Sequence, residues 1–243
     1  MKKILLIIGL LTIFTGCSAL SETVHDETKE NEPKDRESLN IEDKKGPLDG
    51  KVIILDPGHG GEDPGAMANG LVEKDLNLTV SEYVRDYLLD LGATVLMTRT
   101  TDTNLSLDDR AIFSAEYGAD IFVSIHHNTN EESYVQGTEV YFNKTPFEGD
   151  QNPYPIESEM LATFIFNHLT KYGDLQPLAI KDDGFAVLRK NIAPSALVEV
   201  AFVTNAKDAT LLKNEENLMD YGKRIVKGIE QYFQWIESPS YQN

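Results

Sequence analysis

Lys51-Val-Ile-Ile-Leu55-Asp56-Pro57-Gly58-His59-Gly60-Gly61 is the stretch that decides the fold of this chain. A short, continuous apolar run that ends at a Pro-Gly turn is typical of a strand buried on both faces. Such strands belong to parallel sheets that are covered by helices on both sides. The stretch therefore predicts an α/β fold, with a histidine just beyond the end of a buried strand.

Strand and helix patterns alternate along the rest of the chain. Further strands are expected at 94–98, 120–125, 137–142, 185–188 and 196–202. Helices are expected at 73–91, 106–117, 157–172, 207–213 and 215–236, and 143–156 has no period and is expected to be a loop. We therefore predict one α/β domain over 47–243, built on a mostly parallel twisted sheet with helices on both faces.

The N-terminus is typical of an export signal. Lys2 and Lys3 precede the apolar run from Ile4 to Phe14, which is too short to span a bilayer. The small residues before Cys17 resemble the lipobox of bacterial lipoproteins, which implies a signal peptide over 1–16 and a lipid on Cys17. The alternative is a plain secretory signal with an incidental cysteine. Either interpretation places the protein outside the cytoplasm; the lipoprotein interpretation adds an anchor in the bacterial membrane.

Acidic residues dominate the segment 17–46, which has few apolar residues and no aromatic ones. Such a segment does not bury enough surface to offset its ordering entropy, so we interpret it as a disordered tether. The whole chain has 22 basic and 40 acidic residues and a formal charge of −18. This balance argues against nucleic acid as a partner, because phosphate binding depends on clusters of Lys and Arg.

Metal-binding residue types follow two of the expected strands. A single cysteine excludes cysteine-rich metal motifs, so a metal site must use His, Asp and Glu. His59 follows the first strand, and His126 and His127 follow the third and point to opposite sides because side chains alternate along a strand. Glu73 opens the first long helix and can point back over the His59 turn. Two histidines, one carboxylate and a water form a common catalytic zinc set.

Each of these candidate residues, and Glu199 in the strand expected at 196–202, also has a purely structural interpretation. His59 is acceptable as a turn residue, and Glu73 as an acid that favours a helix N-terminus. Glu199 stands in an otherwise apolar strand, where a charge is costly unless it has a task or a partner such as Arg189 or Lys190.

The motifs, in order, resemble one family. They are Leu55-Asp56-Pro57-Gly58-His59-Gly60-Gly61, Gly65, Glu73-Lys74-Asp75-Leu76-Asn77, Ser124-Ile125-His126-x-Asn128, Gly137, and Leu197-Val198-Glu199-x-x-Phe202-x-x-Asn205. Together they resemble the zinc-dependent N-acetylmuramoyl-L-alanine amidases of bacterial cell-wall turnover. The resemblance runs from about Lys51 to Phe233, nearly the whole expected domain.

The resemblance implies roles for four residues. His59, Glu73 and His126 would hold one zinc ion per chain, and Glu199 would be the catalytic acid/base. The implied reaction is hydrolysis of the amide bond between N-acetylmuramic acid and L-alanine of the stem peptide in peptidoglycan. The family usually has a small residue at the position of His127, so His127 is not implied as a ligand.

Weaker expectations concern the surroundings of this site. Asn128 and Arg189 are candidates for substrate contacts, and Asp56 and Asn128 for orienting the ligands. His127 is expected in the cleft wall or behind a ligand. The loop 143–156 looks too short to plug a groove, so we expect a groove that is open without an activator, in a monomer.

Two other functions remain open at this stage. One is a zinc hydrolase that cuts a different amide, and the other is a catalytically silent lipoprotein that binds cell-wall fragments. The presence of Glu199 speaks against the second, because a binding protein needs no proton shuttle.

Overall fold

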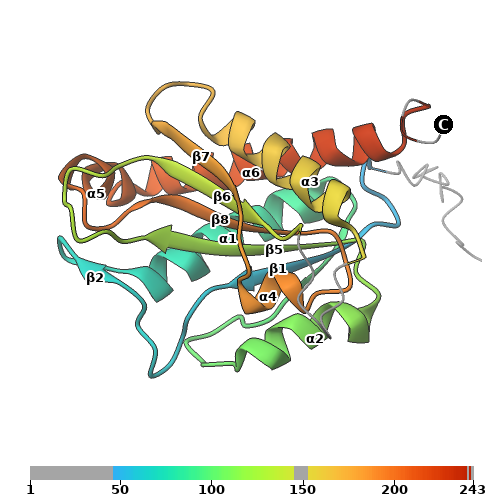
Figure 1. Ribbon diagram of the computed structural model, residues 1–243, viewed down its shortest axis with the longest axis horizontal. Helices are drawn as coiled ribbons and strands as arrows, with labels where there is room; N and C mark the ends of the chain where they lie inside the picture. The colour runs from blue at the N-terminus through green and yellow to red at the C-terminus, as the bar shows by residue number, and fades with distance from the viewer. Residues whose placement is uncertain (1–45, 145–152, 240, 242–243) are drawn as a thin grey trace, which may run out of the picture. The chain divides into compact units, whose positions relative to one another are not determined.

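A six-stranded sheet forms the centre of the computed structural model, which describes residues 46–144, 153–239 and 241 (Figure 1). The strands lie in the order β4-β1-β5-β8-β6-β7. They are β1 Val52–Pro57, β4 Thr94–Met97, β5 Ile121–Asn128, β6 Thr138–Phe142, β7 Pro177–Asp182 and β8 Ser195–Phe202. Strands β4, β1, β5 and β8 are parallel, whereas β6 pairs antiparallel with β8 and parallel with β7. The prediction of a mostly parallel sheet is confirmed.

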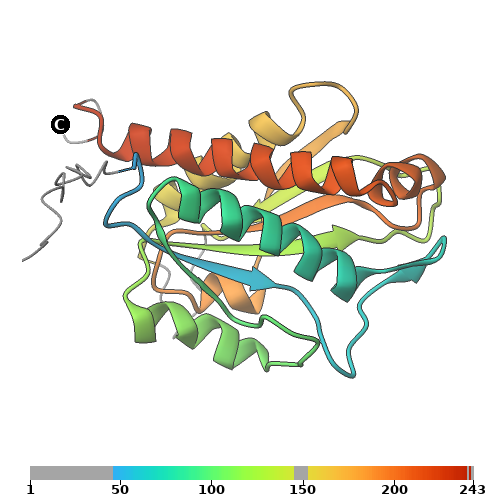
Figure 2. The ribbon, with the colours of Figure 1, turned by 180° about the vertical axis from the view of Figure 1, so that it is seen from behind.

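Helices cover both faces of this sheet, as predicted. They are α1 Glu73–Asp90, α2 Leu107–Tyr117, α3 Pro155–Leu169, α4 Ala186–Arg189, α5 Ala206–Leu212 and α6 Glu215–Ile236. Figure 2 shows α1 and α6 lying side by side over one face, where α3 also packs. Helices α2 and α4 pack against each other on the opposite face (Figure 1). A small hairpin, β2 Met67–Ala68 and β3 Leu71–Val72, precedes α1.

Side-chain alternation in the strands divides the interior into two apolar layers. Ile53 and Leu55 of β1 belong to the large core beneath α1, α3 and α6. Ile54 points the other way, into a smaller cluster that includes Val187 and Leu188 of α4. The apolar layer under α2 and α4 is therefore the smaller of the two. The polar residues of the candidate site, described below, lie toward this side of the sheet.

Local signals explain where the first two helices begin and end. Helix α1 begins at Glu73. The apolar residues along one side of this helix (Leu76, Val80, Val84 and Leu88) are buried. The Ser106 hydroxyl accepts a hydrogen bond from the Asp109 backbone N–H at 3.1 Å and so caps the N-terminus of α2. Helix α2 ends at Gly118, whose φ of 63° is left-handed.

The predicted strand at 185–188 is wrong. Ala186–Arg189 is instead the short helix α4, and the strand of this region is β7, Pro177–Asp182. Short apolar runs do not distinguish a strand from a buried helical turn. Strand β7 gives a weak signal because it is an edge strand with four exposed residues and a proline at its first position, where no ladder hydrogen bond is lost.

Several expectations fall outside the described residues. The signal peptide 1–16, Cys17, almost all of the tether 17–46 and residues 145–152 of the expected loop belong to this group. Among the residues that are described, no helix is both long and apolar enough to cross a membrane.

Candidate functional site

The loop after β1 carries His59 in an unusual backbone conformation. His59 has a φ of 58°, a left-handed conformation that is uncommon for a residue with a side chain. Gly58, directly before it, leaves room for another histidine: a Cβ at Gly58 would lie 2.2 Å from Cε1 and Nε2 of His126. Gly65 does the same for Glu73, whose Oε2 would lie 2.5 Å from a Cβ at that position. These two glycines are therefore required by the closeness of the side chains around them.

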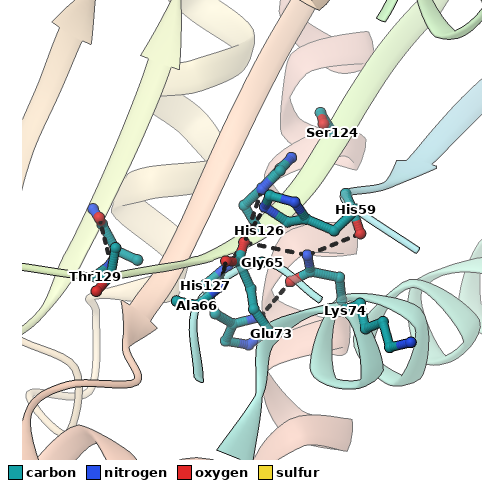
Figure 3. Close-up of polar contacts among 12 residues, drawn as sticks. His59, Gly65, Ala66, Glu73, Lys74, Ser124, His126, His127 and Thr129 are labelled. Carbon is teal, nitrogen blue, oxygen red and sulfur yellow. Dashed lines mark hydrogen bonds and ion pairs between the residues drawn. The ribbon is translucent and has the colours of Figure 1, made fainter. Parts of the chain in front are cut away.

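Glu73 is the residue on which the two histidines converge (Figure 3). His59 Nε2 lies 3.1 Å from Glu73 Oε1, and His126 Nδ1 lies 2.9 Å from the same oxygen. The second oxygen, Oε2, accepts a hydrogen bond from the Ala66 backbone N–H at 2.7 Å. Burial acts to raise the pKa of Glu73, but the hydrogen bonds to His126 and His59 outweigh it and lower that pKa. The carboxylate is therefore ionised at neutral pH.

A second carboxylate fixes the orientation of His59. Asp63 Oδ2 lies 2.7 Å from His59 Nδ1, and Asp63 Oδ1 accepts from the Gly65 backbone N–H at 3.1 Å. The hydrogen bond to His59 lowers the pKa of Asp63, so Asp63 is a charged acceptor for a proton on Nδ1. With Nδ1 bound to Asp63, Nε2 is the ring nitrogen that faces Glu73 and is available to a metal ion. Sequence reasoning gave Asp63 no role, although it lies in the same glycine-rich loop.

His126 and His127 point to opposite sides of β5, as strand alternation predicts (Figure 3). His127 is buried on the side of α1, where its Nδ1 lies 2.8 Å from Asn77 Oδ1. Burial lowers the pKa of His127 to about 3, so its ring stays neutral. His127 borders the cavity described below; its backbone N–H donates to Glu73 Oε1 at 3.4 Å, whereas its ring is bound to Asn77 of α1.

Glu199 lies one strand away from this cluster. It is opposite His126 in the pairing of β5 with β8 and opposite Glu139 in the pairing of β6 with β8. Its Oε2 is buried without a hydrogen-bond partner. Burial, and then the negative charges of Glu73 and Glu139, raise the pKa of Glu199 well above its ordinary value. An ion pair with Lys190 is not formed, since Lys190 pairs with Asp108.

A polar network behind Glu199 was not foreseen from the sequence. Glu139 accepts hydrogen bonds from Asn128 Nδ2 at 2.8 Å and from the Tyr141 hydroxyl at 2.7 Å, and it pairs with Lys181 of β7. Asn128 Oδ1 accepts from the Thr129 backbone N–H at 2.8 Å, so the carboxamide is held at both ends. Only the missed strand β7 brings Lys181 here, which is why no sequence signal pointed to the network.

The remaining predicted residues are placed differently. Asp56 is buried and binds Thr98, Ser124 and Arg110, rather than holding a member of the His59–Glu73–His126 cluster. Arg189 is the last residue of α4 and lies beyond the residues that line the cavity.

A cavity of about 660 Å³ opens beside the cluster. One wall, which we call the ligand wall, consists of His59, Glu73, His126 and the adjoining Gly65. The apolar part of the lining, which we call the apolar wall, consists of Leu105, Leu107, Phe185, Ala186, Val187 and Leu197. Glu199 and Asn128 lie in the same cavity, whose size is that of a typical small-molecule site.

The ligand wall fits a zinc ion. One donor atom from each of His59, Glu73 and His126 can be chosen so that all lie within 4.8 Å of one another. Two imidazoles and a carboxylate are a common catalytic zinc set, in which the fourth position is left for water. The glycines that make room for these side chains, and Asp63 behind His59, are the kind of support that metal-binding histidines receive.

A family profile described as N-acetylmuramoyl-L-alanine amidase matches residues 53–231. The chain belongs to this amidase family. It is 40% identical to YqiI of Bacillus subtilis over 187 residues, which are 77% of this chain and 87% of YqiI. It is 36% identical to the amidase LytC of the same organism over 78% of this chain, but this region is only 37% of LytC.

Solved structures of amidases share the fold. The crystal structure of N-acetylmuramoyl-L-alanine amidase from Clostridium difficile 630 superposes with a TM-score of 0.69 at 30% sequence identity. The match covers 76% of this chain and 97% of the amidase. The α/β architecture predicted from the sequence is therefore that of the family.

Proposed function

We propose that this protein is a zinc-dependent N-acetylmuramoyl-L-alanine amidase. It would hydrolyse the amide bond between N-acetylmuramic acid and the L-alanine of the stem peptide in peptidoglycan. The observation that carries the proposal is the convergence of His59, Glu73 and His126 beside the unpartnered carboxyl of Glu199, in one cavity of an amidase-family domain.

His59 Nε2, His126 Nδ1 and Glu73 Oε1 are the atoms we assign to the metal. When bound, zinc polarises the substrate carbonyl and makes water more acidic. Asp63 keeps a proton on His59 Nδ1, so that Nε2 remains free to bind.

Glu199 is the group to which we assign the proton transfers. Its carboxyl takes a proton from the attacking water and delivers one to the amine that leaves with L-alanine. The raised pKa of Glu199 suits the second transfer, because a carboxyl that holds its proton more tightly is a better donor to the leaving amine. We assign Asn128 to a substrate hydrogen bond, since it borders the cavity and its carboxamide is held by Glu139 and Thr129.

Location and partners form a separate part of the proposal. We propose that a lipid on Cys17 anchors the protein to the outside of the bacterial membrane, and that 17–46 is the tether. Peptidoglycan is then the partner within reach, and the protein would act as a monomer without an activator. The relatives named above include a LytC amidase, which supports action on the cell wall.

One experiment tests the catalytic assignment. Full-length wild type and Glu199→Gln are compared for zinc content and for release of stem peptides from purified peptidoglycan, with Glu116→Gln on the exposed side of α2 as control. We expect one zinc in all three proteins and a loss of kcat of about 10²–10⁴-fold in Glu199→Gln alone. Zinc without release of free amines from any protein would favour an amidase of different specificity or a silent binding protein. Absence of bound zinc would overturn the metal assignment.

A further inference from the structure

Two buried arginines hold the loop that carries His59. Arg99, just after β4, donates from Nε to Pro57 O at 2.9 Å and from Nη2 to Gly58 O at 2.8 Å. Arg110 of α2 donates to Pro57 O and to His59 O, both at 2.8 Å. Each arginine is 3% exposed. Three successive carbonyls of the loop are thus satisfied by two guanidinium groups.

Arg99 also reaches the helix that carries Glu73. Its Nη2 donates to Lys74 O at 2.8 Å, and Nη1 donates to Thr101 O at 3.2 Å. One guanidinium therefore joins the carbonyl just before His59 to the carbonyl just after Glu73. This connection depends on the planar fork of arginine, because a lysine ammonium is a single point on a flexible stem.

The loop needs such support for two reasons. His59 holds a left-handed conformation, which persists only where the surroundings determine it. Buried carbonyls without donors are also costly. A buried cation is itself costly, and in Arg99 the hydrogen bonds found go to backbone carbonyls of the segments that carry His59 and Glu73.

We propose that Arg99 is a positioning residue for the metal site, which fixes the spacing between His59 and Glu73 and thereby sets zinc affinity. Arg110 supports the His59 side of the same arrangement through His59 O. The inference rests on the metal part of the proposed function. It assigns Arg99 no contact with substrate.

Zinc affinity of the folded protein is the quantity that tests this role. The full-length chain is stripped of metal, and zinc is titrated against a competing chelator for wild type, Arg99→Lys, Arg99→Gln and the control Arg85→Lys. Arg85 lies on α1, as Glu73 does, but its Nε binds Asp86. We expect zinc binding about 10–100-fold weaker in Arg99→Lys, weaker still in Arg99→Gln, and unchanged in Arg85→Lys. Cobalt-substituted Arg99→Lys should also show altered visible bands.

A purely structural role predicts a different result. Arg99→Lys would then lower the melting temperature of the metal-free protein while folded molecules bound zinc as tightly as wild type, and this outcome would overturn the proposal. If neither Arg99 variant folds, the arginine supports the whole domain and the proposal is also overturned. Failure of wild type to bind zinc is distinguishable from both, because it removes the metal site itself.

Discussion

The two walls of the cavity are built in opposite ways. In the ligand wall, Glu73 is 4% exposed and each of its oxygens has a hydrogen-bonding partner. In the apolar wall, Leu107 is 58% and Phe185 38% exposed, whereas Val187 and Leu197 are buried, so the outer part of this wall is in contact with solvent. Catalytic groups need fixed geometry, whereas an apolar surface fits a substrate without exact placement. The contrast suggests that the ligand wall governs kcat and metal affinity and the apolar wall governs KM.

The largest effect should come from filling the space behind His126. In Gly58→Ala, the new Cβ would lie 2.2 Å from ring atoms of His126, so the imidazole must move away from Glu73. Gly58 has no left-handed φ, so the backbone itself tolerates alanine. We expect loss of zinc binding by about 100-fold or more and a comparable loss of activity, measured by metal analysis and chelator competition.

Gly118→Ala is the matched control for that variant. It strains the left-handed end of α2, and nothing lies within 4 Å of the added Cβ. We expect about 1 kcal/mol of lost stability and unchanged zinc affinity. Wild-type zinc affinity in Gly58→Ala would show that the ligand wall adapts, and the contrast between the walls would be wrong.

Glu199 lines the same cavity, and its Oε2 is buried without a hydrogen-bond partner among the described residues. The unfolded chain releases this proton near the ordinary pKa of 4.5, whereas the folded protein keeps it to higher pH. Above about 4.5 the folded state therefore binds more protons than the unfolded state, and the free energy of unfolding falls as pH rises. Glu199→Gln removes this penalty. In metal-free protein we expect it to be more stable than wild type by about 1–3 kcal/mol at neutral pH.

Urea unfolding of metal-free protein across the range from acidic to mildly alkaline pH measures this difference. It should shrink toward acidic pH, where wild-type Glu199 is protonated in both states, and Glu116→Gln should show no such trend. A constant or opposite difference would mean that the Glu199 carboxyl is ionised in the folded protein. If Glu199→Gln stabilises the protein and abolishes its activity, the Glu199 carboxyl serves catalysis at a cost to the stability of the fold.

The sequence was sufficient where short-range rules apply. The alternation of side chains along a strand predicted that His126 and His127 point to opposite sides, and the helix expected at 73–91 begins at Glu73 as predicted. Both strands β1 and β5 are buried runs whose ends are marked by the same motifs that carry the histidines.

Long-range contacts were not predictable in this way. Arg99, Arg110 and Lys181 have no local pattern, because their partners are carbonyls or carboxylates supplied by distant segments. The short helix α4 was predicted as a strand because apolar content alone does not separate a helical turn from a strand, and the edge strand β7 was missed because four of its six residues are exposed. Residues of α4 form part of the apolar wall, so this wall was not predicted from the sequence either.

The smallest effect is expected in the apolar wall. Phe185 contacts the Tyr141 ring edge-on at a centroid distance of 5.0 Å and borders the cavity. In Phe185→Ala we expect KM for soluble muropeptides to rise about 3- to 10-fold with kcat nearly unchanged, since a partly exposed ring contributes about 1 kcal/mol of apolar contact. Ile192→Ala, an exposed apolar change outside the cavity lining, is the control and should leave KM as in wild type. A fall in kcat at constant KM would instead place Phe185 among the groups that position the reacting atoms, and the two walls would then share one task.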